Sequence, residues 1–343
     1  MPSAFTLSRR SVLLMPACLA ACNWKTSVVE LSGTTMGTTY SLAAVDHSNV
    51  LSRSELQDAV DGALFAVNRA LSNWDRDSEI SRLNAARTSS PIAISPDLRH
   101  TLAAAEEIHH ASEGQFDVTV GPLVELWGFG AGRAAPNRPA TDAIADAKAA
   151  GGQSQALRLG ANTVEKLKPE AEIYLAGIGK GFGVDKVAEA LKAHGLKDFM
   201  VEIGGDIVTA GRNPDGLPWQ LGIERPQMGR AGVLEVVEVS GKGLATSGDY
   251  RNFFVEGGQR YSHIIDPTTG RPITHQTVSA TVVADNAMLA DGWATAMLAL
   301  GRERGLAVAE ANKIAVLFVE REGDGPDAAL TLSRSRHLSQ LQA

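Results

Sequence analysis

Apolar residues recur at helical spacing in several separate stretches of the chain. In the first, which starts after Ser54, apolar side chains return every three or four residues as far as Leu71, so one helix face is expected to be buried. The second runs from Pro96 to Ala111 and stops before Gly114, a residue type that commonly ends helices. The same pattern predicts helices over 184–194, 287–300 and 302–312.

Shorter stretches rich in β-branched and apolar residues predict strands between these helices. They cover 33–42, 116–120, 173–175, 199–203, 279–283 and 314–319, and a further strand is expected to begin at Ile207. Residues 128–138 are rich in Gly, Pro and Ala and predict a surface loop. No repeat of fixed period and no long linker divides the chain. The pattern therefore predicts an α+β fold in a single domain, with mixed sheets flanked by helices.

The segment 287–300 is apolar on all sides except at two positions, Asp291 and Thr295. Spaced by four residues, these two oxygen-bearing side chains share one helix face. A carboxylate on a buried helix is costly unless it meets a cation or a full set of donors. Oxygen ligands of this kind suit Mg²⁺, which completes its shell with waters and phosphate oxygens. The alternative is a buried Asp291 that bonds to an arginine or to backbone donors.

The run 261–270 places an imidazole, a carboxylate and hydroxyls on one short turn that ends in glycine. His263, three residues before Asp266, is a candidate general base for a nucleophilic hydroxyl. The alternative is a structural histidine. Zinc is not expected, because no cysteine or paired histidine offers its usual ligands, and the serine hydrolase elbow G-x-S-x-G is absent.

Three further places carry candidate ligand contacts. The glycine-rich run 177–183 surrounds Lys180 and predicts either a phosphate cradle or a tight turn with a solvated lysine. Gly204-Gly205-Asp206 after a strand predicts either a turn or a ligand-contacting edge. Alternation in 116–120 puts Asp117 and Thr119 on one strand face, which is either inward or solvated.

The N-terminus predicts export. Arg9-Arg10 followed by a short apolar stretch is typical of a twin-arginine signal over 1–21, and Leu19-Ala20-Ala21-Cys22 matches a lipobox that would lipidate Cys22. The alternative is an apolar helix with a chance cysteine. Residues 22–30 would then form a lipidated tether, and 31–343 would form the functional domain. Removal of the signal also removes Cys18, so no disulfide is expected.

Composition narrows the partners. The chain has 343 residues, of which 44% are hydrophobic, so it can bury a large core. Without Arg9 and Arg10, 30 basic residues face 39 acidic ones. An excess of negative charge disfavours nucleic acid as a partner.

Together these motifs resemble the FAD:protein FMN transferase family, the ApbE type of periplasmic flavin transferases. The resemblance lies in runs that follow the family's order: 33–40, 71–84, 116–130, 177–185, 202–211, 245–252, 261–272 and 279–301. It implies a T-fold-like domain that binds FAD with Mg²⁺, cleaves the pyrophosphate, and joins FMN through its phosphate to a Thr or Ser hydroxyl of an acceptor protein, with release of AMP.

The resemblance also implies roles for single residues. Asp291 and Thr295 match the metal ligands, together with a backbone carbonyl near Gly177. His263 is the candidate base, and Asp266 would orient either His263 or the turn around it. The positions that match FAD contacts are Met36, Trp74, Gln115, Phe116, Asp117, Lys180 and Ile265.

The chain departs from the family pattern at Tyr174. Where the family often has Asp-Leu-Ser-Gly-Ile-Ala-Lys-Gly, residues 174–181 are Tyr-Leu-Ala-Gly-Ile-Gly-Lys-Gly, so an aromatic ring replaces a carboxylate. The chain has no acceptor motif of its own, so the expected partner is an exported flavoprotein that carries a Ser/Thr flavinylation motif. The expected location is the periplasmic face of a bacterial membrane, with the inner membrane favoured. The rival functions are FAD hydrolysis to FMN and AMP, and flavin or solute binding without chemistry.

Overall fold

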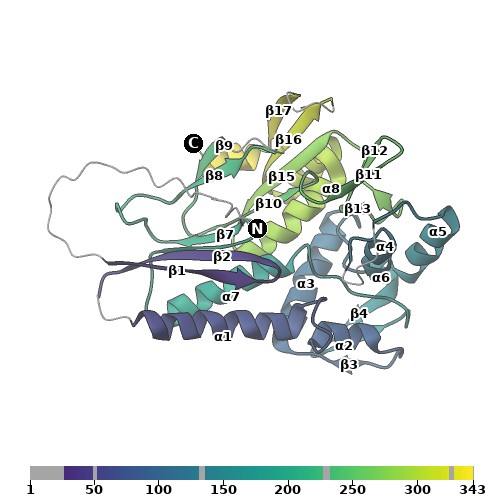
Figure 1. Ribbon diagram of the computed structural model, residues 1–343, viewed down its shortest axis with the longest axis horizontal. Coiled ribbons are helices and arrows are strands. Elements are labelled where there is room, and N and C mark those ends of the chain that lie inside the picture. The colour runs from purple at the N-terminus through teal and green to yellow at the C-terminus, as the bar shows by residue number, and fades with distance from the viewer. Residues whose placement is uncertain (1–26, 49–51, 131–135, 227–231, 324–327, 343) are drawn as a thin grey trace, which may run out of the picture.

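The computed structural model describes residues 27–48, 52–130, 136–226, 232–323 and 328–342. Its largest sheet has eight strands, and every neighbouring pair is antiparallel (Figure 1). In spatial order the strands are β1 (Ser27–Thr35), β2 (Thr38–Asp46), β6 (Phe199–Ile203), β7 (Asp206–Ala210), β10 (Gly243–Gly248), β15 (Thr277–Ala284), β16 (Ala315–Glu322) and β17 (Ala329–Arg334).

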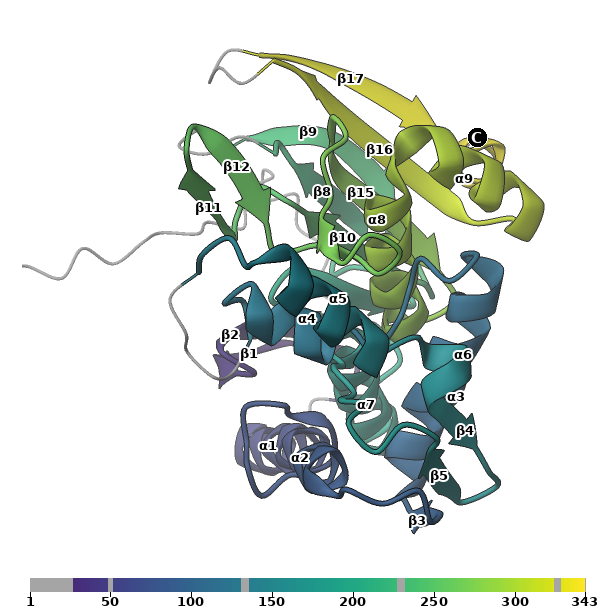
Figure 2. The same cartoon turned by 90° about the vertical axis from the view of Figure 1, so that its right-hand side faces the viewer.

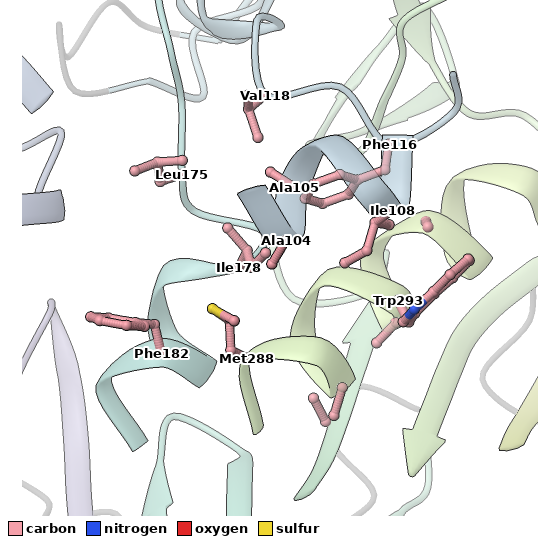
Figure 3. Packing of buried hydrophobic residues seen from close by; sticks show 14 of the residues in the cluster. Ala104, Ala105, Ile108, Phe116, Val118, Leu175, Ile178, Phe182, Met288 and Trp293 are labelled. Carbon is pink, nitrogen blue, oxygen red and sulfur yellow. The ribbon is translucent and has the colours of Figure 1, made fainter. Parts of the chain in front are cut away.

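Helices cover one face of this sheet (Figures 1 and 2). Helix α7 (Gly179–Ala193) packs on β6 and β7, α8 (Ala287–Asn312) packs on β10 and β15, and α1 (Arg53–Leu71) lies beside α7. Helix α3 (Pro96–Ala111) in turn packs against α8. Ile108 of α3, Phe182 of α7 and Met288 of α8 belong to one buried cluster between these helices (Figure 3).

Two elements cover the other face of the large sheet. They are the hairpin of β8 (Gln220–Glu224) and β9 (Val233–Glu238), and helix α9 (Arg336–Leu341). Leu221 of β8, Leu317 of β16 and Leu338 of α9 share a buried cluster there. Because both faces are covered, β15 is buried from Thr277 through Val283.

Smaller elements complete the chain. Around α3 lie helices α2 (Glu79–Ala85), α4 (Gly121–Leu126), α5 (Thr141–Ala150) and α6 (Gln153–Ala156), with a small sheet of β3 (Ile92–Ala93), β5 (Thr163–Lys166) and β4 (Leu157–Leu159) (Figure 2). Two hairpins, β11 (Phe253–Glu256) with β12 (Gln259–Ser262) and β13 (Ile265–Asp266) with β14 (Arg271–Pro272), lie outside the large sheet.

The predicted α+β class, in a single domain with helices flanking sheets, is confirmed, but the strand pairs of the described residues are antiparallel rather than mixed. Helix α3 has the predicted bounds. The two helices predicted at 287–300 and 302–312 are the halves of α8, which is interrupted at Gly301 with φ 71° and ψ 169°. A Cβ on Gly301 would lie only 2.8 Å from the ring of His275. Glycine is therefore needed at this interruption both for the positive φ angle and because there is no room for a side chain.

Several predicted boundaries near the N-terminus were wrong. The strand predicted over 33–42 is a hairpin, because Met36 and Gly37 take positive φ angles of 49° and 72° and turn β1 into β2. Strand β1 begins at Ser27, so the predicted tether does not extend over 27–30. The cap of α1 is Ser52 rather than Ser54, since Ser52 Oγ accepts from Glu55 N.

Two predicted strands and one helix start were also wrong. Residues 116–120 form turns rather than a strand, and the Asp117 carboxylate accepts bonds from N and Oγ1 of Thr119. Residues 173–175 form no strand, although Tyr174 N donates to the Val118 carbonyl at 2.7 Å. Helix α7 starts at Gly179, five positions before the predicted start at Val184, so Lys180 lies in its first turn. The predicted signal over 1–21 and lipidation at Cys22 lie outside the described residues.

No helix in the described part of the chain is long and apolar enough to cross a bilayer.

Candidate active site at the junction of two cavities

Two neighbouring cavities contain most of the predicted site residues. One, of about 420 Å³, is lined by Asp291 and Thr295, among others. The other, of about 760 Å³, is lined by Met36 and Trp74. Residues that line both mark the junction: Val124, Tyr174, Ala176, Lys180, Asn252 and His263. A ligand with two arms joined by a compact polar centre would therefore have its centre beside Lys180 and His263.

The N-termini of α7 and α8 cross beside this junction. Gly181 N donates to Asp291 Oδ2 at 3.0 Å, so a carboxylate of α8 caps α7. Ala287 N and Met288 N each donate to the Asp185 carboxylate at 2.9 Å, so α7 caps α8 in return.

Glycine allows this close crossing. A Cβ on Gly181 would lie 2.2 Å from the Ala287 carbonyl oxygen and 2.8 Å from Asp291 Cβ. The glycine-rich run that suggested a phosphate cradle thus allows α7 and α8 to pack closely. It also places the first turn of α7 at the cavity wall.

A buried charge cluster lies on the crossing. Lys180 Nζ donates to Asp206 Oδ2 and lies 3.5 Å from Asp291 Oδ1. Asp206 and Asp291 are only 2% and 3% exposed. Burial alone would lower the pKa of Lys180, but the two carboxylates outweigh it and hold that pKa above its usual range. Burial, and then the neighbouring Asp291, raise the pKa of Asp206 well above its usual value.

The oxygens around Asp291 fit a hard cation. Thr295 lies one turn along α8 from Asp291, and its Oγ1 lies 3.2 Å from Ser247 Oγ. A Cβ on Gly177 would lie 3.1 Å from Thr295 Oγ1, so the Gly177 backbone passes close to this hydroxyl. Within the described residues no three His, Cys, Asp or Glu side chains form a metal-binding group. The carboxylate of Asp291 and the hydroxyl of Thr295 are oxygen donors, the ligand type that Mg²⁺ takes in proteins.

His263 is oriented by a backbone carbonyl. Its Nδ1 lies 3.0 Å from Asn252 O, and because a carbonyl only accepts, Nδ1 must carry the proton of the neutral ring. Nε2 is then the unprotonated nitrogen. Burial lowers the pKa of His263 below its usual value, against the opposing effect of the Asn252 carbonyl. The ring is thus prepared to accept a proton near neutral pH.

Asp266 organises the turn and has no hydrogen bond to His263. Its Oδ1 accepts from Thr268 N at 2.8 Å, from Thr268 Oγ1 at 2.7 Å and from Gln115 Nε2 at 2.8 Å. Of the two roles considered for Asp266, the geometry favours orientation of the turn. Asp266 lines neither cavity, whereas Gln115 and Ile265 line the smaller one.

Phe116 and Asp117 also line the smaller cavity. Asp117 Oδ2 accepts from Gln153 N at 2.9 Å, while its Oδ1 accepts from Thr119. Both carboxylate oxygens therefore brace the turn that forms this wall.

An aromatic pair lies in the larger cavity. Trp74 is 59% exposed, and its ring centroid lies 5.6 Å from that of Tyr174, tilted by 56°. The backbone around Tyr174 is held by asparagine side chains: Asn84 bonds both N and O of Ile173, each at 2.8 Å, and Asn73 accepts from Leu175 N at 3.0 Å. These side chains replace the strand partner that 173–175 lacks.

The predicted site residues that the structure describes thus line the two cavities, except for Asp266, which lies behind the cavity wall. Sequence reasoning did not assign Asp206, Ser247 or Asn252 to the site. The signal for Asp206 was present in the Gly204-Gly205-Asp206 turn, but its burial against Lys180 depends on packing between α7 and β7. Nothing local in the sequence marks Asn252, which acts through its backbone.

Solved structures share this fold. The flavin transferase ApbE from Vibrio cholerae matches with a TM-score of 0.83 at 41% identity, over 92% of this chain and 99% of that one. The apo flavinyl transferase ApbE of Pseudomonas stutzeri matches with a TM-score of 0.84 at 35% identity, over 92% and 97%. The fold is that of the flavin transferases.

Sequence comparison gives the family. The ApbE family model matches residues 36–318. The FAD:protein FMN transferase of Vibrio cholerae is 45% identical over 307 residues, covering 90% of this chain and 92% of that protein. The one from Haemophilus influenzae is 41% identical over 318 residues, covering 91% and 92%. The chain belongs to the ApbE family.

Proposed function

We propose that the protein is a Mg²⁺-dependent FAD:protein FMN transferase. It would join the FMN part of FAD through its phosphate to a Ser or Thr hydroxyl of an acceptor protein and release AMP. The similarity to FAD:protein FMN transferases supports the activity. The observation that carries the chemistry is the junction, where Lys180 and His263 line both cavities and Asp291 with Thr295 lines one of them.

FAD has two arms joined by a diphosphate, and this shape fits two cavities with a shared polar wall. With the diphosphate at the junction, the Lys180 ammonium would hold its negative charge. The exposed Trp74 and its neighbour Tyr174 offer a surface on which a planar ring can stack. An aromatic Tyr174 would contribute stacking where a carboxylate would contribute a hydrogen bond.

The transfer balances without a further reactant. The acceptor hydroxyl oxygen forms a bond to the FMN phosphorus, and the bond from that phosphorus to the bridging oxygen breaks. The bridging oxygen leaves on AMP. The hydroxyl proton passes to His263 Nε2, which the Asn252 carbonyl keeps free to accept it.

Asp291, Thr295 and the backbone near Gly177 would hold Mg²⁺, which when bound neutralises charge on the diphosphate. Gly181 N, in the first turn of α7, donates a hydrogen bond to the Asp291 carboxylate and so keeps that carboxylate in place. Lys180, in the same turn, would fix the phosphates from the other side.

The proposal includes the location and the partner. The twin-arginine signal and Cys22 support an enzyme anchored by lipid at the periplasmic face of a bacterial membrane. The acceptor would be an exported flavoprotein that carries a Ser/Thr flavinylation motif.

Intact-mass spectrometry tests the proposal. The mature protein is mixed with FAD, Mg²⁺ and an exported acceptor that carries the motif, with an acceptor whose hydroxyl residue is replaced by Ala as the control. We expect a mass gain of FMN minus water on the first acceptor only, with release of AMP. AMP and free FMN with an unmodified acceptor would instead identify a hydrolase, and unchanged FAD would identify a binding protein.

A further inference from the structure

Asp206 is a buried carboxylate that the transfer reaction, as derived above, does not use. It is the first residue of β7 and follows Gly204 and Gly205, whose positive φ angles of 58° and 100° form the turn from β6. Gly204, Gly205 and Ile207 line the smaller cavity, whereas Asp206 lines neither cavity. It therefore cannot act by touching a ligand there and must act through a neighbour.

That neighbour is Lys180. Its ammonium lies between two carboxylates, bonded to Asp206 Oδ2 and 3.5 Å from Asp291 Oδ1. Asp291 Oδ2 accepts from the fixed backbone donor Gly181 N, whereas Oδ1 faces the lysine, whose side chain can move. A lysine and a metal ion would compete for this oxygen, because both are positive and both need the same lone pairs.

Without Asp206, the nearest carboxylate to the lysine would be Asp291. An unpaired ammonium in a buried place is costly, so Lys180 would move onto Asp291 Oδ1 and satisfy it. With Asp206 present, the lysine has a partner of its own. The cluster then carries two carboxylates against one ammonium, and the net negative charge still attracts a cation.

We infer that Asp206 is a positioning residue that takes the shorter bond from Lys180, so that the ion pair of Lys180 with Asp291 stays long, at 3.5 Å, and the Asp291 carboxylate remains available to a divalent cation. The inference rests on the proposed function, because it concerns the metal site described there. It assigns a task to the Gly204-Gly205-Asp206 turn: the glycines place the strand start at the cavity wall, and the carboxylate that follows restrains the lysine.

A double-mutant cycle tests this. Mg²⁺ is titrated into the ligand-free mature protein and followed by isothermal titration calorimetry in the wild type, Asp206→Asn, Lys180→Met and the double variant. We expect Asp206→Asn to weaken Mg²⁺ binding about tenfold or more, because the released lysine pairs with Asp291. In the Lys180→Met background, Asp206→Asn should weaken Mg²⁺ binding about threefold or less, since no lysine is left for Asp206 to restrain.

The matched control is Asp198→Asn. Asp198 lies at the other end of the same hairpin, next to β6, where it accepts from Arg212 N. This variant removes one carboxylate from the hairpin without touching Lys180, and its Mg²⁺ affinity should equal that of the wild type.

Equal losses from Asp206→Asn with and without Lys180 would overturn the inference, because Asp206 would then act on the metal directly. Unchanged affinity in Asp206→Asn would overturn it as well. If the wild type binds no Mg²⁺, the proposed metal site fails together with the inference. Should Asp206→Asn not fold, Asp206→Ser replaces it in the cycle, because it also removes the carboxylate, and a smaller loss of Mg²⁺ affinity in the Lys180→Met background remains the expected result.

Discussion

Asp185 and Asp291 cap each other's helices. Asp185 lies on α7 and accepts the first two N–H groups of α8, while Asp291 lies on α8 and accepts Gly181 N in the first turn of α7. Each carboxylate thus stabilises the positive end of the neighbouring helix dipole. The candidate metal ligand Asp291 is therefore fixed by the same contacts that join the two helices.

Asp185 should make stability depend on pH. Burial raises its pKa to about 6, against the opposing effect of the two backbone donors. Between an unfolded value of 3.8 and the folded value, the folded state holds more of the proton, so this group's contribution to stability is largest below pH 4 and is lost as pH rises through 6.

Asp185→Asn removes this titration. At pH 7 the variant should lose about 1 kcal/mol of unfolding free energy with its helix cap. The difference between wild type and variant should grow as pH falls from 7 to 4, as urea denaturation at a series of pH values would measure. A difference that shrinks on acidification would contradict the assignment.

Gly181→Ala should separate the two helices. Its Cβ would meet the Ala287 carbonyl oxygen at 2.2 Å, so we expect a loss of about 1 to 3 kcal/mol of unfolding free energy and weaker Mg²⁺ binding. Gly62→Ala is the control, because Gly62 lies in α1 with nothing within 4 Å of the added carbon. That variant should gain about 0.5 to 1 kcal/mol. Equal stability changes in thermal melts would contradict the packing argument.

Asp291→Ala should abolish flavin transfer while the protein stays soluble. The variant loses the candidate metal ligand together with one helix cap, and the cap accounts for about 1 kcal/mol of stability. We expect transfer to fall more than about 100-fold at saturating FAD. Retained transfer with an unchanged Mg²⁺ requirement would rule out Asp291 as the ligand.

His263→Ala should bind FAD and fail to transfer FMN. Loss of a general base reduces rates by about 10² to 10⁴. Because burial lowers the pKa of His263, the wild-type rate should rise with pH below about 6.5 and stay level above neutrality. The rise should be absent from the residual activity of the variant, as single-turnover rates across this range would measure. Wild-type turnover in the variant would exclude His263 as the base.

Asn84→Ala should loosen the cavity wall. The change removes a donor and an acceptor from the buried backbone of Ile173, so we expect a loss of about 2 to 4 kcal/mol of unfolding free energy. Hydrogen exchange would locate the effect at Ile173 if the bonds act as described. Asn312→Ala is the comparison, because its amide bonds the Val308 and Ala111 carbonyls at the surface and should cost far less.

Local signals explain which elements the sequence predicted well. Helix α3 was predicted correctly because Ser95 caps it, Pro96 begins it and Gly114 follows it, and all three act within a few residues. Residues 173–175 misled the prediction because Ile173 and Leu175 bond to the side chains of Asn73 and Asn84, about 90 to 100 positions away, rather than to a strand.

The site residues likewise divide into those with a local signal in the sequence and those placed by contacts between distant segments. Asp291 and Thr295 were found because two polar side chains on an apolar helix are a local anomaly. The restraint of Lys180 by Asp206, and of His263 by the Asn252 carbonyl, arises only when separate strands and loops pack together. Spacing along the chain carries no trace of either contact.

The asparagine clamp on 173–175 grips main-chain atoms and leaves the side chain at 174 outside its bonds. Other residues thus fix the backbone at this position, while the Tyr174 ring itself packs against the cluster that contains Trp127. Substitution at this position changes what a ligand meets while the wall keeps its shape. The side chain at 174 can therefore differ among chains that share this scaffold, and in this chain Tyr174 presents an aromatic ring to both cavities.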